Sequence, residues 1–265
     1  MTAYLTRGEL EQLCCVAQAA GREVTAVYAT DFASWSKDDA SPLTQADLRA
    51  DAVIRKGLEA AFPGMFILSE ESSSQAAQPQ QTFFLVDPLD GTKEFLKRND
   101  EFTVNIALVH GGEPIAGVVL APALGELFYA ARGLGAWLRT GEGAAVALKT
   151  APSINTASLR VIGSRSHGGD ALAAWLDRLD REYTFLAAGS SLKFCRIAQG
   201  AADIYPRLGP TSQWDTAAAQ AVLQEAGGAV LDPQGQPLAY GLDRPVLNPH
   251  FIAVGDPRLL FPPLA

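Results

Sequence analysis

The feature that most constrains the fold is an apolar run that ends in two aspartates. Residues 83–86 (Phe-Phe-Leu-Val) are typical of a buried strand, and Asp87 and Asp90 follow it three residues apart. The proline between them cannot continue a strand ladder, and Gly91 permits a backbone conformation that a side chain would resist. Such a turn can aim both carboxylates and the carbonyl of Leu89 at one point. Three hard oxygens at one point suit Mg²⁺ or Ca²⁺ better than zinc.

Three other interpretations of this segment must be weighed. Asp-Pro-x-Asp-Gly is also ordinary turn chemistry, so the segment alone leaves a plain turn and a functional site about equally open. Residues 90–92 (Asp-Gly-Thr) resemble the haloacid-dehalogenase phosphatases, but their nucleophilic aspartate would stand at Pro88, so that covalent mechanism is excluded. An EF-hand loop with Gly91 at its sixth position would run from Val86 to Lys97, neither of which can ligate as required. The next residue, Thr92, would be the first residue of the following element, whose outward-pointing backbone N–H groups could bind an anion.

Further carboxylates occur at the predicted ends of other elements. Glu70 and Glu71 follow a predicted strand, and Asp215 opens a predicted helix over 216–226. Taken singly, the two glutamates are solvated loop residues and Asp215 is a plain helix cap. As a ligand, Asp215 would lie at the positive end of a helix dipole. Asp47 lies in the first turn of another predicted helix, where its default role is also to complement the dipole.

The first 150 residues combine two helices with closely spaced strands. The first helix begins at Thr6, which forms a capping box with Glu9, and the second begins near Thr44 and ends at residues 63–64 (Pro-Gly). Residues 111–112 (Gly-Gly) predict a hairpin turn, and residues 75–81 a surface loop. The predicted strands cover 66–69, 82–86, 103–110, 114–121, 127–131 and 136–139.

The remainder of the chain alternates between strands and helices. A polar, turn-prone stretch at 151–158 is the candidate boundary between the two parts. Beyond it, strands are predicted over 159–162, 183–187 and 202–205. The helices, capped by Asp170, Ser190 and Asp215, are predicted over 170–179, 191–199 and 216–226, and Gly227 ends the last. This alternation indicates an α/β second part.

Composition restricts the class of protein. The 265 residues carry a net charge of −8 and are 48% hydrophobic, which excludes a disordered chain and argues against a nucleic-acid polymer as partner. No window of 18 uncharged apolar residues and no signal-peptide core occur, so no transmembrane segment is expected. The three cysteines, Cys14, Cys15 and Cys195, fit a reducing compartment. We therefore expect a cytoplasmic protein; the sequence leaves peripheral association with the inner membrane face and a homodimer open.

Four blocks in order together resemble the inositol monophosphatase superfamily of Mg²⁺-dependent, lithium-sensitive phosphomonoesterases. The blocks are residues 37–47, 69–71 (Ser-Glu-Glu), 86–92 (Val-Asp-Pro-Leu-Asp-Gly-Thr) and 214–218 (Trp-Asp-Thr-Ala-Ala). Within the superfamily, the chain is most similar to the 3′(2′),5′-bisphosphate nucleotidases of the CysQ type. Lys93-Glu94-Phe95 stands where inositol monophosphatases usually have x-Asn-Phe. The similarity extends over residues 93–107, 164–167, 189–195, 205–210 and 247–249.

The resemblance implies a layered αβαβα sandwich of the inositol monophosphatase and fructose-1,6-bisphosphatase type, with the site between its two parts. Residues 1–150 would form an α+β part with most metal ligands, and residues 151–265 an α/β part with Asp215 and the nucleotide-binding residues. Asp47 and Thr92 would orient and deprotonate the attacking water. Two to three Mg²⁺ ions would be bound by Glu70 (in preference to Glu71), Asp87, the Leu89 carbonyl, Asp90 and Asp215.

The same resemblance supplies positions for a nucleotide with a second phosphate. His167, Lys193 and Arg207 would be its cations and Ser190 a hydroxyl donor; taken singly, Lys193 is a solvated helix residue and Arg207 a surface-loop cation. The residue that stacks on adenine stays open: Phe194 and Tyr205 are candidates, although the default for both is the core. The remaining substrate contacts would come from Glu70, Leu89, Asp90, Gly91, Thr92 and Asp215.

The resemblance therefore predicts a phosphatase that acts on a small-molecule nucleotide. It would remove the 3′-phosphate of adenosine 3′,5′-bisphosphate, a by-product of sulfate assimilation, to give AMP and phosphate. The alternative is the same chemistry on an inositol phosphate or another small sugar phosphate. A catalytically silent nucleotide- or metal-sensing module would be favoured if a ligand position were lost, and none is. The ranking of 3′,5′-bisphosphates, 2′,5′-bisphosphates and sulfated nucleotides stays open.

Overall fold

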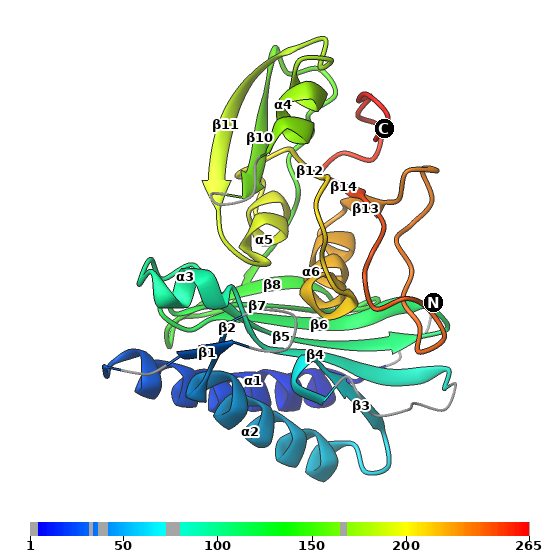
Figure 1. The fold of residues 1–265 in the computed structure, drawn as a ribbon. Coiled ribbons are helices and arrows are strands. Elements are labelled where there is room, and N and C mark those ends of the chain that lie inside the picture. The colour runs from blue at the N-terminus through cyan, green and yellow to red at the C-terminus, as the bar shows by residue number, and fades with distance from the viewer. Residues whose placement is uncertain (1–4, 32–33, 37–41, 73–79, 165–168, 265) are drawn as a thin grey trace.

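The computed structural model of the chain describes residues 5–31, 34–36, 42–72, 80–164 and 169–264, and these form five layers. Figure 1 shows α1 and α2 beneath a large sheet and α5 and α6 on its other side. A smaller sheet covers α5 and α6, and α4 packs on its outer face. The expected αβαβα sandwich is confirmed.

The large sheet has seven strands in chain order, β3-β4-β5-β6-β7-β8-β9. β3 and β4 are parallel, and all the other neighbours are antiparallel. Gly111 (φ +59°) and Gly112 (φ +88°) close the β5–β6 hairpin, as predicted. The strands are β3 (Phe66–Ser69), β4 (Thr82–Asp90), β5 (Thr103–His110), β6 (Glu113–Ala121), β7 (Glu126–Ala131), β8 (Gly135–Thr140) and β9 (Val146–Ala147).

Both faces of this sheet are buried, which explains the continuous apolar run in β4. Phe84 and Val86 join the cluster with α1 and α2, whereas Phe83 and Leu85 join the cluster with α5 and α6. Side chains alternate between the faces of a strand, so a strand that is covered on both sides is apolar throughout. The two covering helices are α1 (Arg7–Tyr28), with the predicted Thr6 capping box, and α2 (Gln45–Ala61).

The smaller sheet has the strand order β11-β10-β12-β14-β13. β10 lies parallel to β11 and β12, whereas β14 is antiparallel to β12 and β13. The strands are β10 (Ser158–Ser164), β11 (Glu182–Ala188), β12 (Ile204–Arg207), β13 (Ala229–Leu231) and β14 (Phe251–Val254). Three helices pack on it, namely α4 (Asp170–Leu176), α5 (Leu192–Ala198) and α6 (Gln213–Glu225). β13 and β14 were not predicted.

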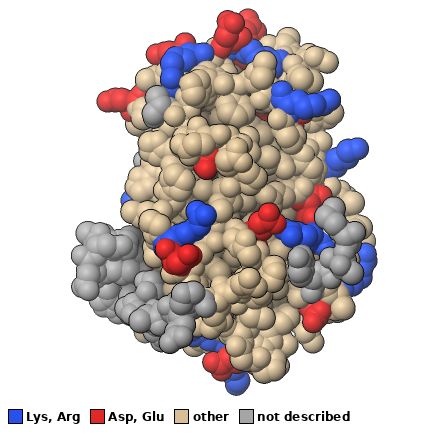
Figure 2. Space-filling model, turned by 90° about the vertical axis from the view of Figure 1, so that its right-hand side faces the viewer, with Lys and Arg blue, Asp and Glu red and all other residues tan. Residues whose placement is uncertain are grey.

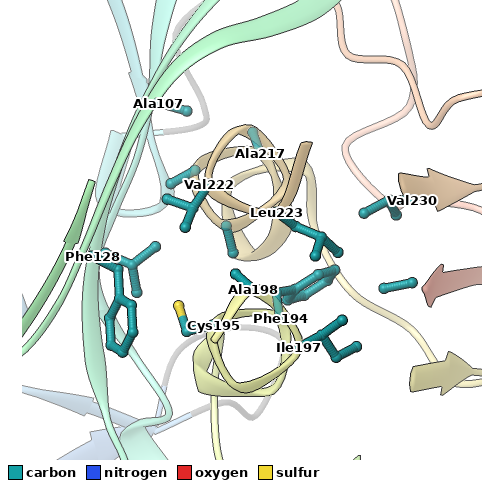
Figure 3. Close-up of a cluster of buried hydrophobic side chains, with 14 of the residues drawn as sticks. Ala107, Phe128, Phe194, Cys195, Ile197, Ala198, Ala217, Val222, Leu223 and Val230 are labelled. Atoms are coloured by element: carbon teal, nitrogen blue, oxygen red, sulfur yellow. The ribbon is translucent and has the colours of Figure 1, made fainter. Parts of the chain in front are cut away.

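The layer between the sheets is densely packed. Figure 3 shows side chains of α5, such as Phe194 and Cys195, gathered with Val222 of α6 and Phe128 of the large sheet. The helix α6 approaches β6 closely, because a Cβ atom on Gly117 would lie 2.1 Å from the carbonyl oxygen of Ala218. A side chain there would push α6 away from the sheet.

The starts of three helices differ from the predictions. Asp170 is the first residue of α4 and the N-cap is Gly169, without a side-chain hydrogen bond. α5 has Ser191 as its N-cap, not Ser190. α6 begins three residues early, at Gln213, with Ser212 as its N-cap and Asp215 as the third helical residue of a capping box. An aspartate can stand at the N-cap of a helix or at its third residue, and the same apolar pattern follows in both cases. The pattern therefore did not show which of the two positions Asp215 occupies.

The remaining elements are short and were not predicted as elements. They are β1 (Ser34–Ser36), β2 (Pro42–Thr44), the 3₁₀ turn η1 (Glu70–Ser72) and α3 (Thr92–Leu96). Within the described residues, no helix combines the length and apolar character needed to cross a membrane. Figure 2 shows acidic and basic side chains scattered over one largely uncharged face, without a basic stripe. Most of the predicted loop at 75–81 lies outside the described residues.

Candidate active site

The two aspartates lie at the end of β4, where the chain turns sharply. The pairing of β4 with β5 is irregular between Asp87 and Asp90, so the proline interrupts the ladder as predicted, but pairing resumes at Asp90 and β4 extends four residues beyond the predicted strand end at residue 86. Oδ1 of Asp87 accepts a hydrogen bond from the Leu89 N–H (3.0 Å), and Gly91 adopts a left-handed conformation (φ +90°). α3 begins at Thr92, whose Oγ1 donates to the Leu89 carbonyl (3.3 Å). The turn therefore fixes both aspartates and one carbonyl.

Carboxylates from four elements line one cavity of about 870 Å³ at this turn. Glu70 comes from η1, Asp87 and Asp90 come from β4, Glu94 comes from α3, and Asp215 comes from α6. The cavity also includes Leu89 and Thr92, whereas Glu71 is not among its described lining residues. The cavity thus brings together five acidic residues, including the four predicted carboxylate ligands, which lie up to 145 positions apart, from Glu70 to Asp215.

Burial and mutual repulsion disfavour the charged forms of these acids. The pKa of Asp87, which is 1% exposed, is raised well above its usual range, first by burial and then by Glu70, Asp90 and Asp215. Burial also raises the pKa of Asp90, and burial followed by the charge of Asp90 raises the pKa of Asp215 to about 8. A buried group of negative charges is stable as anions only when a cation offsets them.

The donor chemistry of this cluster fits a hard divalent cation. All its donors are carboxylate or carbonyl oxygens, which are the ligands of Mg²⁺ and Ca²⁺. In the described part of the chain, no group of three or more His, Cys, Asp or Glu side chains is already arranged to hold a metal ion. The fit therefore rests on the oxygen donors, their burial and their repulsion.

Three basic residues line the same cavity, namely Lys93 and the two predicted cations Lys193 and Arg207. Lys193 is 5% exposed and its Nζ donates to the Ser190 carbonyl (2.6 Å), so the default for a lone lysine, a solvated helix residue, does not apply here. Burial lowers the pKa of Lys193 to about 8, although the charge of Asp90 opposes this shift. Arg207 lies on β12 and is half-buried, so it is not a surface-loop cation either. Its Nη2 donates to the Pro210 carbonyl (2.7 Å), whereas its Nε is buried without a hydrogen-bond partner.

Ser190 lines the cavity between the two halves of the fold. It is not a helix cap; its backbone is in the left-handed region (φ +41°), which costs about 1–3 kcal/mol for a non-glycine residue. Its Oγ is buried without a hydrogen-bond partner. A strained residue with an unpaired hydroxyl in a cavity is typical of a position that contacts a ligand.

Some predicted residues are not placed at the cavity. His167 lies outside the described residues, as do residues 37–41 of the first sequence block. Asp47 is buried and its Oδ2 accepts hydrogen bonds from the N–H (2.8 Å) and Oγ1 (2.7 Å) of Thr44, which is the capping-box role. Asp47 is not among the described residues that line the cavity, so its role toward water stays a prediction.

The aromatic candidates belong to the core, as their default predicted. The ring of Phe194 lies 5.3 Å from that of Tyr205 and 5.6 Å from that of Phe251, between centroids. All three rings are 2% exposed or less, although they line the cavity. Cys195 is a buried thiol whose pKa is raised by burial, which makes it inert at neutral pH.

Comparison with known proteins assigns the chain to a family. The family model described as "Inositol monophosphatase family" matches residues 9–256, which is most of the chain. The chain belongs to the inositol monophosphatase family. This confirms the family resemblance of the four sequence blocks, three of which contribute residues to the cavity.

Relatives within the inositol monophosphatase family agree in sequence and structure. The chain is 45% identical over 247 residues to the 3′(2′),5′-bisphosphate nucleotidase CysQ of Salmonella typhimurium, covering 91% of this chain and 98% of that protein. Identity to the Escherichia coli K12 protein of the same name is 44% with the same coverage. The crystal structure of CysQ from Bacteroides thetaiotaomicron is 34% identical, with a TM-score of 0.82 over 95% of this chain and 98% of that one. The inositol monophosphatase from Anabaena is 26% identical with a TM-score of 0.74, over 94% and 90%.

The sequence indicated no role for Ser191, although Ser191 forms hydrogen bonds with two of the acidic residues that line the cavity. Its N–H (2.7 Å) and its Oγ (2.9 Å) both bond to Oδ2 of Asp90, and Oγ lies 2.6 Å from the carbonyl oxygen of Asp215. Asn105 Nδ2 donates to Ser191 Oγ (2.9 Å) and to Asp90 (3.3 Å). The hydroxyl has one hydrogen and shares it between Asp90 and Asp215, while the N–H stays on Asp90. Ser191 therefore ties the end of β4 to the first turn of α6.

Proposed function

We propose that the protein is a Mg²⁺-dependent phosphatase that converts adenosine 3′,5′-bisphosphate to AMP and phosphate. The observation that carries the proposal is that one cavity is lined by both the acidic cluster and Arg207 with Lys193. The 45% identity to a 3′(2′),5′-bisphosphate nucleotidase over nearly its whole length supports the nucleotide as substrate. Three unpaired cysteines and an acidic composition favour the cytoplasm as the location.

The acidic cluster accounts for the metal dependence. Glu70, Asp87, Asp90, Asp215 and the carbonyl of Leu89 would hold two to three Mg²⁺ ions. When bound, the ions supply charge to offset the phosphate dianion and lower the pKa of a coordinated water. Asp90 is positioned for this by three donated hydrogen bonds of 3.3 Å or less, from Ser191 and Asn105. All three bonds end on Oδ2 of Asp90, so none of these donors occupies Oδ1, which could then bind a metal ion.

One residue of the turn and one residue of α2 would act on the attacking water. The hydroxyl of Thr92 is fixed at the Leu89 carbonyl, beside both aspartates. We assign to Thr92 the orientation of the water and to Asp47 the removal of its proton. The absence of a paired Cys–His or Ser–His arrangement in the sequence agrees with direct attack by water, without a covalent intermediate.

The basic side chains would bind the phosphate that is not cleaved. The planar guanidinium of Arg207 can form two hydrogen bonds to a phosphate, and its Nε is available for one of them. Ser190, Lys193 and His167 would complete this subsite. An inositol monophosphate has no second phosphate, so this basic group distinguishes the nucleotide from the rival substrate.

Metal removal tests the proposed reaction. We expect chelator-treated protein to release phosphate from adenosine 3′,5′-bisphosphate at least about 10³-fold more slowly, because the buried acids then repel the substrate. Added Mg²⁺ should restore the rate, and lithium should inhibit it. Phosphate release is measured colorimetrically, and circular dichroism checks that the chelated protein stays folded. Undiminished release in excess chelator would contradict the metal-dependent mechanism.

A further inference from the structure

An exposed apolar surface lines the cavity beside its charged groups. Val246 and Leu247 are 38% and 59% exposed, and both belong to the cavity lining. We call these two residues the apolar ledge. Exposed leucines and valines are common on protein surfaces, but a pair inside a functional cavity is a contact surface for an apolar part of a ligand.

The large apolar side chains that line the rest of the cavity offer little free surface. Phe194, Tyr205 and Phe251 are each 2% exposed or less, because their rings pack against one another. Trp214 is 7% exposed. Within the described lining, the ledge therefore provides the large apolar side chains that a ligand can cover.

The ledge is held rigidly by the start of α6. The side chain of Gln213 donates to the carbonyls of Gly241 (3.0 Å) and Pro245 (2.9 Å), and its backbone N–H donates to the carbonyl of Val246 (2.8 Å). On the other side, Asn248 Nδ2 donates to the Ser212 carbonyl (2.7 Å). A loop with these bonds at both ends presents its side chains in one arrangement, which lowers the entropy cost of binding.

The ledge also has a fixed position relative to the acidic cluster. Leu247 forms a β-bridge with Ser212, the N-cap of α6. The N–H of Ser212 in turn donates to Oδ2 of Asp215 (2.9 Å). The backbone of Ser212 therefore joins Leu247 directly to Asp215.

We propose that the apolar ledge binds the purine base of the nucleotide. This inference rests on the proposed function and extends it to the part of the substrate that the charged residues do not recognise. A purine has two apolar faces that can cover Leu247 and Val246, whereas an inositol ring presents hydroxyl groups that such a surface would leave unpaired. The ledge therefore contributes to selection of a nucleoside bisphosphate over a polyol phosphate.

The test compares substrates with and without a base. We expect Leu247→Ala to lower kcat/KM for adenosine 3′,5′-bisphosphate about tenfold, as for the loss of apolar contacts in a pocket. The same variant should change kcat/KM for ribose 3,5-bisphosphate less than twofold, because that substrate keeps both phosphates but has no base. Calorimetry with AMP provides a second measurement, in which Leu247→Ala should weaken binding by a similar factor. Leu260→Ala is the matched control, since Leu260 is 86% exposed and is not among the described lining residues.

The outcomes separate this inference from the function on which it rests. Equal losses on both substrates, or no loss on either, would overturn the role of the ledge while leaving the nucleotidase activity in place. If the wild-type protein hydrolysed neither adenosine 3′,5′-bisphosphate nor ribose 3,5-bisphosphate, that result would overturn the proposed function and, with it, the role of the ledge. Since Leu247 is more than half exposed, its truncation should leave the fold intact.

Discussion

We expect the replacement of Asp90 with asparagine to slow phosphate release by a factor of about 10³ or more. Asparagine has the size of aspartate and its oxygen can still accept the hydrogen bond that the Ser191 N–H donates at 2.7 Å. The negative charge is lost, and with it one anionic ligand of the acidic cluster. Because burial raises the pKa of Asp90, the neutral side chain is tolerated and the free energy of unfolding should not fall. Single-turnover kinetics and thermal unfolding measure the two effects.

Asp203→Asn is the matched control for a buried aspartate outside the cavity. Asp203 is 1% exposed and accepts hydrogen bonds from the backbone N–H (2.7 Å), Nε (3.0 Å) and Nη2 (2.6 Å) of Arg160. Its replacement should cost about 2 kcal/mol of stability, since the arginine is partly solvated, and should leave kcat unchanged below the unfolding temperature. Turnover by Asp90→Asn near the wild-type rate, or an equal loss in both variants, would contradict the assignment of Asp90 as a metal ligand.

The second large effect concerns Arg207. Arg207→Ala should raise KM for adenosine 3′,5′-bisphosphate about 100-fold, which is the scale of losing a charge-assisted pair in a desolvated site. For adenosine 3′-monophosphate, which lacks the second phosphate, KM should change less than threefold. Initial rates over a range of each substrate measure the difference.

Arg196→Ala is the corresponding control for loss of an arginine. Arg196 lies on α5, where its Nη2 pairs with Glu126 (2.7 Å), and it is not among the described residues of the cavity. We expect Arg196→Ala to lower the free energy of unfolding and to leave KM unchanged for both the bisphosphate and the monophosphate. If Arg207→Ala raised KM equally for the bisphosphate and the monophosphate, Arg207 would not belong to a second-phosphate subsite.

The parts of the site that depend on local chemistry could be predicted from the sequence. The turn after β4 follows from Pro88 and Gly91, whose backbone limits are intrinsic to those residues. The capping box of Thr6 is likewise local, because its two partners lie three residues apart, whereas the corresponding box of Thr44 and Asp47 was not predicted. The position of Asp215 at the start of a helix was predicted. The sequence made it the N-cap, however, whereas it is the third residue of α6.

The parts that depend on distant contacts could not be predicted. Ser191 and Asp90 are 101 positions apart, and nothing near either residue indicates that they bond. Lys193 is buried because backbone carbonyls and the ring of Tyr205, 5.3 Å from Nζ, replace its water. A lysine in a short helix is usually solvated, so the helix pattern alone favoured the wrong environment, and only the family resemblance indicated otherwise. The apolar ledge resembles an ordinary surface turn until the cavity beside it is known.

The most direct test of the central claim is a comparison of two substrates at saturating Mg²⁺. We expect kcat/KM for adenosine 3′,5′-bisphosphate to exceed that for inositol 1-phosphate by a factor of about 100 or more, since the basic subsite and the ledge act on the nucleotide alone. The nucleotide product should be AMP with its 5′-phosphate retained, as chromatography would show. A preference for inositol 1-phosphate would keep the acidic cluster as the metal site and contradict the assigned roles of Arg207, Lys193 and Leu247.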